Sequence, residues 1–233
     1  MSGYFVTGTD TGVGKTFVTC AIAAALRRRG RTVGVFKPAE TGCEERAGEL
    51  VASDAAALLS ISESGQSDAE VCPVRFRDPA APLAAAEAAG EQIDASSLVR
   101  AAKALADRFD PVLVEGAGGL LVPLARDTTY ADFASALGFP VLVVVGAKLG
   151  CINHALLTFE VLARRGLSTV GWILNEVVSQ PGETLAHETH RELIERFSDL
   201  PYLGHLPHVA PGSCQSPSEF AALGEAGLKL GVF

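Results

Sequence analysis

The chain of 233 residues is 48% hydrophobic and 20% charged, a balance typical of a soluble enzyme or binding protein, here expected to fold as a single domain over residues 1–233. Its 27 acidic and 19 basic residues give a formal net charge of −8, which would repel nucleic acid and anionic membranes, so we expect neither as a partner. The longest apolar strand-like run, at residues 140–146, is far shorter than the roughly 20 residues that cross a bilayer.

Short β-branched runs alternate along the chain with segments of helical apolar spacing. The predicted strands cover residues 4–7, 32–37, 112–115, 141–145 and 169–175, and the predicted helices cover 16–29, 97–108, 152–165 and 183–197. This alternation predicts an α/β fold with a doubly wound, mostly parallel sheet. Ligands of such sheets bind beyond the carboxyl ends of the strands. The Ala-rich tract at 81–90 predicts a loop or short helix without a functional role.

The amino terminus and the cysteines indicate the compartment. No basic stretch or apolar signal region precedes the first predicted strand, so we expect a cytoplasmic protein. The five cysteines are scattered and include no C-x-x-C pair, which favours free thiols over disulfides or a zinc site.

A glycine-rich segment lies between the first predicted strand and the first predicted helix. It reads Gly8-Thr9-Asp10-Thr11-Gly12-Val13-Gly14-Lys15-Thr16 and is typical of a phosphate-binding loop. Its free N–H groups would bind phosphate oxygens, Lys15 would meet the β- and γ-phosphates, and Thr16 would offer a hydroxyl to Mg²⁺. Five residues separate Gly8 from Gly14 where the common pattern has four, so the loop is a variant form. The alternative, a turn that binds nothing, would leave Lys15 and Thr16 at these positions by accident.

Two acids are candidate magnesium ligands, because Mg²⁺ takes oxygen ligands and only one or two carboxylates. Glu115 ends an apolar strand and runs into Gly116-Ala117-Gly118-Gly119, where backbone can approach a ligand closely. The alternative is a glutamate that faces solvent. Asp54 is the second acid, and its alternative is a helix N-terminal residue favoured by the helix dipole.

Two further segments could contact a substrate. Lys37 ends the second predicted strand and precedes Pro38, so its side chain could point into the site or into solvent. Thr41 offers a hydroxyl nearby. The segment Lys148-Leu149-Gly150-Cys151-Ile152-Asn153 leaves the fourth strand and starts a helix, which indicates a second group of free N–H groups for an anion. A plain connecting loop is the alternative there.

Taken together, these segments resemble one family, the dethiobiotin synthetases. The similar blocks occur in the family's order within residues 4–209, and the block at 148–154 is far more specific than a phosphate-binding loop. They are Gly8-Thr9-Asp10-Thr11-x-Val13-Gly14-Lys15-Thr16, Lys37-Pro38, Val114-Glu115-Gly116-Ala117-Gly118-Gly119, Lys148-Leu149-Gly150-Cys151-Ile152-Asn153-His154 and Gly171-Trp172-Ile173-x-Asn175. Some members carry a larger or acidic residue in place of Gly12 and serine in place of Thr41. The similarity fades after Pro207.

The resemblance implies a homodimeric P-loop enzyme of biotin synthesis. In the implied reaction, 7,8-diaminopelargonate, CO₂ (or bicarbonate) and MgATP give dethiobiotin, ADP and phosphate through a carbamate and a carbamic-phosphoric anhydride. By position, Thr11, Lys15 and Lys37 would stabilise the transferring phosphoryl group, and Thr16, Asp54 and Glu115 would hold Mg²⁺. The implied nucleotide contacts are Gly12, Val13, Gly14, Lys15, Thr16, Phe17, Asp54, Glu115, Gly116, Ala117, Gly118, Asn175, Glu176, Pro207, His208 and Val209. The implied substrate contacts are Thr41 and, across the dimer interface, Gly150, Cys151, Ile152 and Asn153.

Two other classes share such a loop. A regulatory or partition ATPase would act through nucleotide-dependent dimerisation, but those proteins usually carry a lysine near Asp10 of this chain and often bind DNA or membrane. An amide-forming ligase related to cobyrinate or CTP synthesis usually adds a glutaminase domain, for which we expect this chain to be too short. Phosphate release that depends on the diamine and bicarbonate would distinguish the synthetase from a switch.

Overall fold

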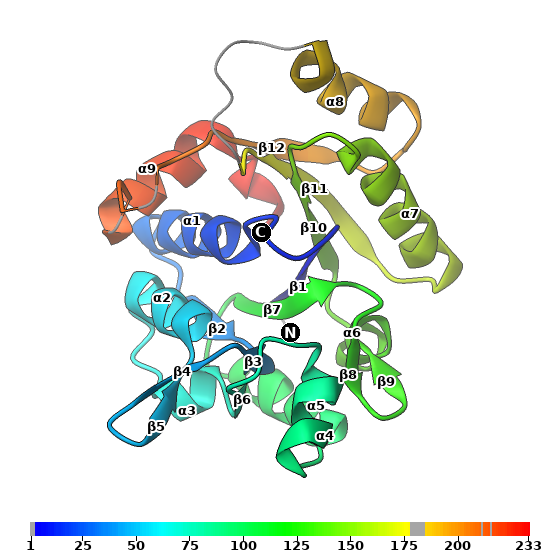
Figure 1. Ribbon diagram of the computed structural model, residues 1–233. Helices are drawn as coiled ribbons and strands as arrows, with labels where there is room; N and C mark the ends of the chain where they lie inside the picture. Colours follow the sequence, from blue (N-terminus) through cyan, green and yellow to red (C-terminus); the bar gives the residue numbers. More distant parts are fainter. Residues whose placement is uncertain (1–2, 178–184, 211, 215) are drawn as a thin grey trace.

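A six-stranded parallel sheet runs through the centre of the molecule (Figure 1). In the computed structural model, which describes residues 3–177, 185–210, 212–214 and 216–233, the strand order is β12-β11-β10-β1-β7-β2. The strands are β1 (Gly3–Gly8), β2 (Gly34–Phe36), β7 (Val112–Gly119), β10 (Val141–Gly146), β11 (Thr169–Asn175) and β12 (Tyr202–Leu206). β1 lies inside the sheet with β10 on one side and β7 on the other, so the chain winds to both sides of β1, and open α/β sheets bind ligands at such a switch point.

Helices cover both faces of this sheet, as Figure 1 shows. One hydrophobic core contains residues of α1 (Lys15–Arg28), α2 (Ser53–Ser62), α3 (Asp68–Val71) and α9 (Pro217–Gly227). The other contains residues of α5 (Ala95–Leu105), α6 (Tyr130–Leu137), α7 (Cys151–Arg164) and α8 (Leu185–Arg196). Neighbouring residues of β1 serve opposite cores, Val6 the first and Phe5 the second, because successive strand residues point to opposite faces.

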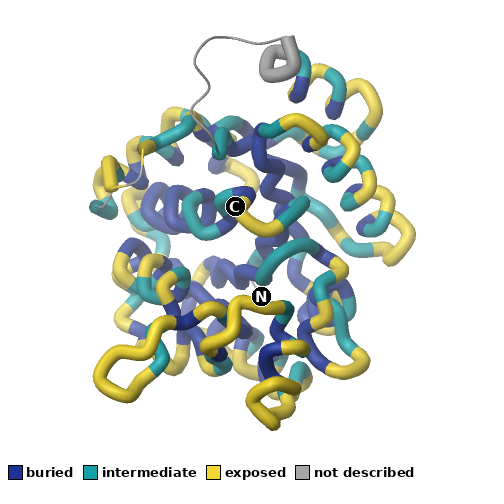
Figure 2. Tube along the Cα trace, viewed as in Figure 1, coloured by how far each residue is buried: buried dark blue, intermediate teal, exposed yellow. Residues whose placement is uncertain are grey.

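Three two-stranded pairs lie outside the central sheet. β3 (Ala39–Thr41) pairs in parallel with β6 (Val74–Phe76), while β4 (Glu44–Arg46) pairs with β5 (Glu49–Val51) and β8 (Pro123–Ala125) with β9 (Thr128–Thr129) in antiparallel fashion. The remaining elements are α4 (Pro82–Ala89) and the 3-10 turn η1 (Leu230–Val232). Figure 2 shows the buried central sheet in dark blue and the β4–β5 hairpin mostly exposed.

The predicted α/β fold with a mostly parallel sheet is confirmed, and all five predicted strands are present. Every residue of β10 is buried, which explains why that run is apolar throughout. β2 is shorter than the predicted strand at 32–37, because Lys37 leaves the sheet and its N–H donates to the carbonyl of Val71 at 2.7 Å. The sequence did not indicate β12, which contains Gly204 and His205 and has no β-branched residue.

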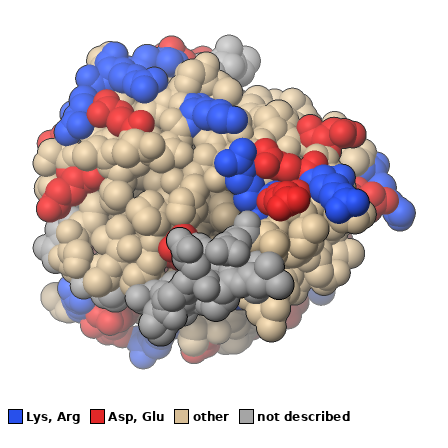
Figure 3. Space-filling view, turned by 90° about the horizontal axis from the view of Figure 1, so that it is seen from above, with Lys and Arg blue, Asp and Glu red and all other residues tan. Residues whose placement is uncertain are grey.

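The four predicted helices correspond to α1, α5, α7 and α8. The prediction for α8 started at residue 183, and residues 183 and 184 lie outside the described part of the chain. The Ala-rich tract is helix α4, which begins with Pro82 at its first turn. Among the described residues, none of the helices has the length and apolar content to span a membrane. Figure 3 shows acidic and basic side chains intermingled on the upper face of the molecule.

Candidate active site

The glycine-rich loop connects β1 to α1 at the carboxyl end of the sheet. Gly14 is the N-cap of α1 with φ 81°, and no described side chain caps this helix, so its first N–H groups are available to an anion. A Cβ at Gly14 would collide with Nδ2 of Asn175, which itself donates to the carbonyl of Val13 at 3.0 Å. The end of β11 therefore braces the loop, and this packing requires glycine at position 14.

Four polar side chains from four elements meet beside this loop. Lys37, just after β2, places its Nζ 2.6 Å from Oε1 of Glu115 in β7 and 2.8 Å from Oδ2 of Asp54 in α2. The hydroxyl of Thr16, in the first turn of α1, donates to the same Oε1 of Glu115 at 2.7 Å. They converge because β7 lies between β1 and β2, which brings the carboxyl ends of all three strands together.

The two lysines of this site have opposite electrostatic environments. Burial lowers the pKa of Lys15, and the neighbouring Lys37 lowers it further, to about 8. Burial would lower the pKa of Lys37 as well, but the carboxylates of Glu115 and Asp54 outweigh it and raise that pKa above its ordinary value. Burial likewise opposes ionisation of Asp54, yet Lys37 holds the pKa of Asp54 below its ordinary value. Lys37 therefore stays charged at neutral pH, whereas the pKa of Lys15 lies only slightly above neutral pH.

A cavity of about 740 Å³ opens in front of the loop. The lining residues that the sequence predicted for the site are Thr11, Gly12, Gly14, Lys15, Thr16, Phe17, Lys37, Thr41, Asp54, Ala117 and Gly118. Glu115 lies behind this surface, fully buried, and reaches the site through Thr16 and Lys37. The alternatives of a solvent-facing Glu115 and a solvent-facing Lys37 are therefore wrong, since Lys37 is only 2% exposed.

The oxygen donors beside the loop fit a hard cation. Oε2 of Glu115 is buried and has no hydrogen-bond partner among the described residues, while the Asp54 side chain is 44% exposed at the cavity. Together with the Thr16 hydroxyl, these groups offer two carboxylates and one neutral oxygen, a donor set that suits Mg²⁺.

Asn175, Glu176 and His208 lie at or just after the carboxyl ends of β11 and β12. Asn175 is buried and contacts the loop at Val13, and its Oδ1 has no hydrogen-bond partner among the described residues. Oε1 of Glu176 lies 2.7 Å from Nε2 of His205, and Oε2 accepts from the backbone N–H of His208 at 3.5 Å. Pro207 and Val209 flank His208 in the same segment after β12. None of these residues lines the large cavity.

The predicted anion loop lies apart from that cavity. Gly150 caps α7 with φ 95°, and Cys151, Ile152 and Asn153 form the first turn of the helix, but none of the four lines the cavity of this chain. Lys148 instead donates to Oδ2 of Asp10 at 2.9 Å and so ties this loop to the phosphate-binding loop.

A second hollow, of about 420 Å³, lies between the phosphate-binding loop, residues 119–123 and α7. Its lining includes Thr9, Asp10, Leu121 and Leu157.

Sequence reasoning missed several residues of the cavity. Glu40 is buried at the cavity and carries no motif. Pro79, Ala80, Ala81 and Pro82 also line it, so the Ala-rich tract at 81–90, predicted to have no functional role, begins at the site. Pro79 and Pro82, just before and at the start of α4, were the available signal, because proline fixes the path of the backbone.

The chain is similar to one family model and to several named proteins. A family model described as an AAA domain matches residues 2–213. The ATP-dependent dethiobiotin synthetase BioD of Bacillus licheniformis is 41% identical over 91% of this chain and 88% of its own length. The protein of the same name from Aromatoleum aromaticum is 43% identical over 94% of this chain and 95% of its own.

Solved structures show the same fold at low identity. A chain of the MinC:MinD cell division protein complex from Aquifex aeolicus is 15% identical, with a TM-score of 0.57 over 97% of this chain and 95% of that one. A ParA family ATPase from Chlorobium tepidum is 12% identical, with a TM-score of 0.54 over 97% and 91%. At such identities these structures support the fold alone, whereas the closely related sequences show that the chain belongs to the family of ATP-dependent dethiobiotin synthetases.

Proposed function

We propose that this protein closes the ureido ring of dethiobiotin from 7,8-diaminopelargonate and CO₂ at the expense of ATP. The observation that carries the proposal is the convergence of Lys15, Lys37 and Thr16 with two acids at one cavity beside a phosphate-binding loop. The names of the relatives, which share 41% to 43% of their residues with this chain, supply the identity of the product.

The chemistry follows in two steps after one substrate amine has taken up CO₂ as a carbamate. A carbamate oxygen attacks the γ-phosphorus, the bond to the β,γ-bridging oxygen breaks, and ADP leaves. The second amine then attacks the carbonyl carbon of the mixed anhydride and loses its proton as phosphate departs. Phosphoryl transfer needs chiefly positioning and positive charge at the developing anions. Lys15, Lys37 and the Thr11 hydroxyl would provide both.

Mg²⁺ would be held by Thr16, Asp54 and Glu115, and it would neutralise charge on the β- and γ-phosphate oxygens. Lys37 contacts both of these acids. Its charge would therefore lie beside the metal ligands and face the carbamate.

The nucleotide would lie along the glycine-rich loop. The first-turn N–H groups of α1 would bind its phosphates, with Phe17 and the Gly116-Ala117-Gly118 backbone beside them. Asn175, whose Oδ1 lacks a partner among the described residues, would read the adenine, and Glu176 with residues 207–209 would border it.

Thr41 would contact the diamine, and a second subunit would complete the substrate site. The predicted carboxylate contacts, Gly150 to Asn153, stand apart from the cavity of their own chain. Leu149, next to this segment, is 89% exposed, and Leu157 and Leu121, which line the second hollow, are 58% and 50% exposed. Burial of such apolar side chains favours association, and a second copy would bring its own N–H groups toward the cavity.

One assay tests the proposal. The purified protein is incubated with diaminopelargonate, bicarbonate and MgATP, and dethiobiotin is sought by mass spectrometry while phosphate is measured. We expect dethiobiotin and an equal amount of phosphate, both dependent on the diamine. Slow phosphate release that ignores the diamine would instead indicate a nucleotide switch and contradict the proposal.

A further inference from the structure

We propose that Glu40 is a positioning residue: its carboxylate caps helix α2 from a separate strand and so holds Asp54 where it can serve as a metal ligand. The proposal rests on the proposed function in one respect, the assignment of Asp54 to Mg²⁺. The relevant contacts all lie among residues 37–55.

Helix α2 begins without a cap of its own. Its N-cap residue is Ala52, which has an extended backbone (φ −84°, ψ 103°) but no side-chain oxygen. The first N–H groups of a helix have no partner within the helix, and an uncapped start is destabilised. Asp54 lies in this first turn, so its position depends on whatever binds those N–H groups.

Glu40 supplies the missing acceptor from β3. Its Oε1 accepts from the backbone N–H of Asp54 at 2.9 Å and from the Ser53 hydroxyl at 3.2 Å, and its Oε2 accepts from the N–H of Ala55 at 2.9 Å. These are the contacts that an N-cap side chain ordinarily makes, here made from outside the helix. The negative charge also faces the positive end of the helix dipole.

The burial and charge of Glu40 argue against a merely incidental contact. The residue is 5% exposed, and burial raises the pKa of its carboxyl, with Asp54 a further like charge nearby. A third carboxylate beside Asp54 and Glu115 is unfavourable unless its oxygens are well bonded. Three donors occupy most of its roughly four acceptor positions, which leaves little capacity to bind a substrate amine.

The same short segment also fixes the Asp54 side chain. Lys37 and Glu40 lie three residues apart; Lys37 bonds the carboxylate of Asp54, and Glu40 bonds its backbone N–H. The segment 37–40 thus holds Asp54 both by its side chain and by its backbone. Loss of the Glu40 contacts would free the backbone while leaving the Lys37 bond, which predicts a looser metal ligand rather than an absent one.

Glu40→Gln tests this without a change of size. The amide loses the charge and turns one acceptor into a donor that faces an N–H group. We expect the amides of Asp54 and Ala55 to exchange hydrogen about 2- to 30-fold faster in the free protein, the range that loss of a helix cap gives. The Mg²⁺ concentration for half-maximal nucleotide binding, measured by calorimetry with ADP, should rise by a similar factor. KM for the diamine at saturating Mg²⁺ should not change.

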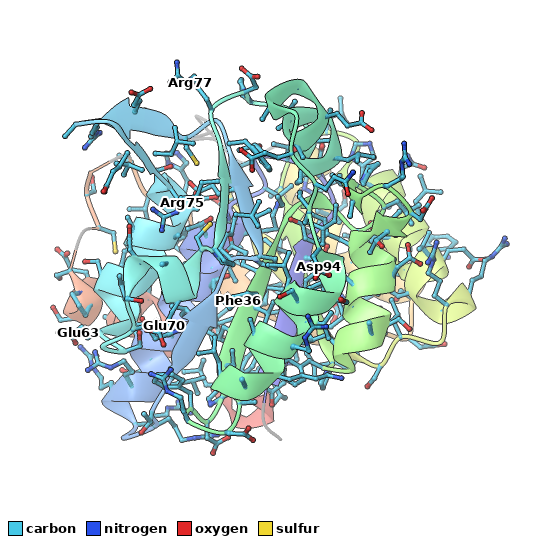
Figure 4. All side chains as sticks on the ribbon, turned by 90° about the horizontal axis from the view of Figure 1, so that it is seen from below. Phe36, Glu63, Glu70, Arg75, Arg77 and Asp94 are labelled. Carbon is cyan, nitrogen blue, oxygen red and sulfur yellow. The ribbon has the colours of Figure 1, made fainter. Side chains whose placement is uncertain are left out.

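Asp94→Asn is the matched control. Asp94 lies at the start of α5 (Figure 4) and caps it by accepting from the N–H of Ser97 at 3.0 Å. Its side chain is exposed and is not part of the cavity lining. Asparagine keeps a capping oxygen and loses only the charge, so this variant should lose little stability and keep the Mg²⁺ dependence of nucleotide binding.

A second pair of variants separates capping from contact with substrate. Ala52→Ser in a Glu40→Ala background places a hydroxyl at the N-cap itself, and we expect it to slow amide exchange and to restore the Mg²⁺ dependence together. If exchange slows but the Mg²⁺ defect persists, or if Glu40→Gln raises only KM for the diamine, Glu40 does not act through Asp54. Neither amide exchange nor the Mg²⁺ dependence of ADP binding requires the ring-closing reaction. A wild-type protein that makes no dethiobiotin would therefore contradict the proposed function alone.

Discussion

Lys15 and Lys37 lie in one buried cluster, yet only Lys37 has carboxylates within hydrogen-bond distance. Lys37→Ala removes a donor placed for the transferring phosphoryl group, and such a loss typically costs ~10²–10³ in kcat. It also leaves Glu115 buried without its cation, which should destabilise the fold by about 3–5 kcal/mol. ATP binding should persist, whereas Lys15→Ala should lose both binding and turnover. Steady-state kinetics and calorimetry measure this, and a Lys37→Ala variant with wild-type kcat would contradict it.

The lowered pKa of Lys15 has a consequence for nucleotide binding. The charged amine binds phosphate, and in the free protein it begins to lose its proton near pH 8. ATP affinity should therefore be highest below pH 8 and fall as pH rises above it, by up to about tenfold per pH unit. Calorimetry in buffers of different ionisation enthalpy should reveal proton uptake on binding at pH 8.5. Lys15→Arg, whose guanidinium stays charged, should abolish that uptake, and unchanged uptake would assign it to another group.

At this scale the sequence predicted residues that belong to motifs and missed those that act through another residue. Lys15, Thr16 and Glu115 were predictable because their neighbours form a recognisable loop or strand end. Glu40 was not, because its role depends on a helix that begins 13 positions later, and no local pattern records that contact. The same holds for Pro79, which lines the cavity and follows β6, a strand that pairs with β3.

The connection between β1 and α1 is an element with restrictive backbone geometry. Gly12 and Gly14 both have positive φ, 72° and 81°, but only a Cβ at Gly14 meets a neighbour, Asn175. Gly12→Ala should cost the ~1–2 kcal/mol of a left-handed backbone. Gly14→Ala should cost clearly more, because the clash adds to that strain. Denaturant unfolding without nucleotide compares the two variants, and equal losses would show that Asn175 can move aside.

Elements were predictable where their pattern was strong. The apolar strand β10 and the helices α1 and α7 match the predicted spans to within one or two residues at each end. The short pairs β3–β6 and β8–β9 were missed because strands of two or three residues are too short to show periodicity. β2 ends early because Pro38 follows Lys37, and that departure from the sheet is what points Lys37 toward Asp54 and Glu115.

The whole molecule presents an apolar region beside its site, and its exposed leucines give a test of dimerisation. If the proposed dimer forms through this region, Leu157→Glu places a charge at its interface, so the dimer should dissociate and affinity for the diamine should fall while ATP still binds. Phe197→Glu is the matched control, because Phe197 is 66% exposed just after α8 and should tolerate the change. Light scattering measures the oligomeric state, and steady-state kinetics measure KM for the diamine. A Leu157→Glu dimer, or a fully active monomer, would contradict the shared site.

The strand order also constrains how the chain can fold during its synthesis. Among the described strands β2 pairs with β7 alone, and β7 lies between β2 and β1. The two earliest strands must therefore keep a gap open until residue 119 has been made. After that, β10, β11 and β12 can add one after another at the other edge of β1, in the order of their synthesis. A nascent chain that paired β1 directly with β2 would have to separate them again before β7 could enter. Ribosome-bound chains that end before β7 should therefore be especially sensitive to proteolysis and prone to association through unpaired strand edges.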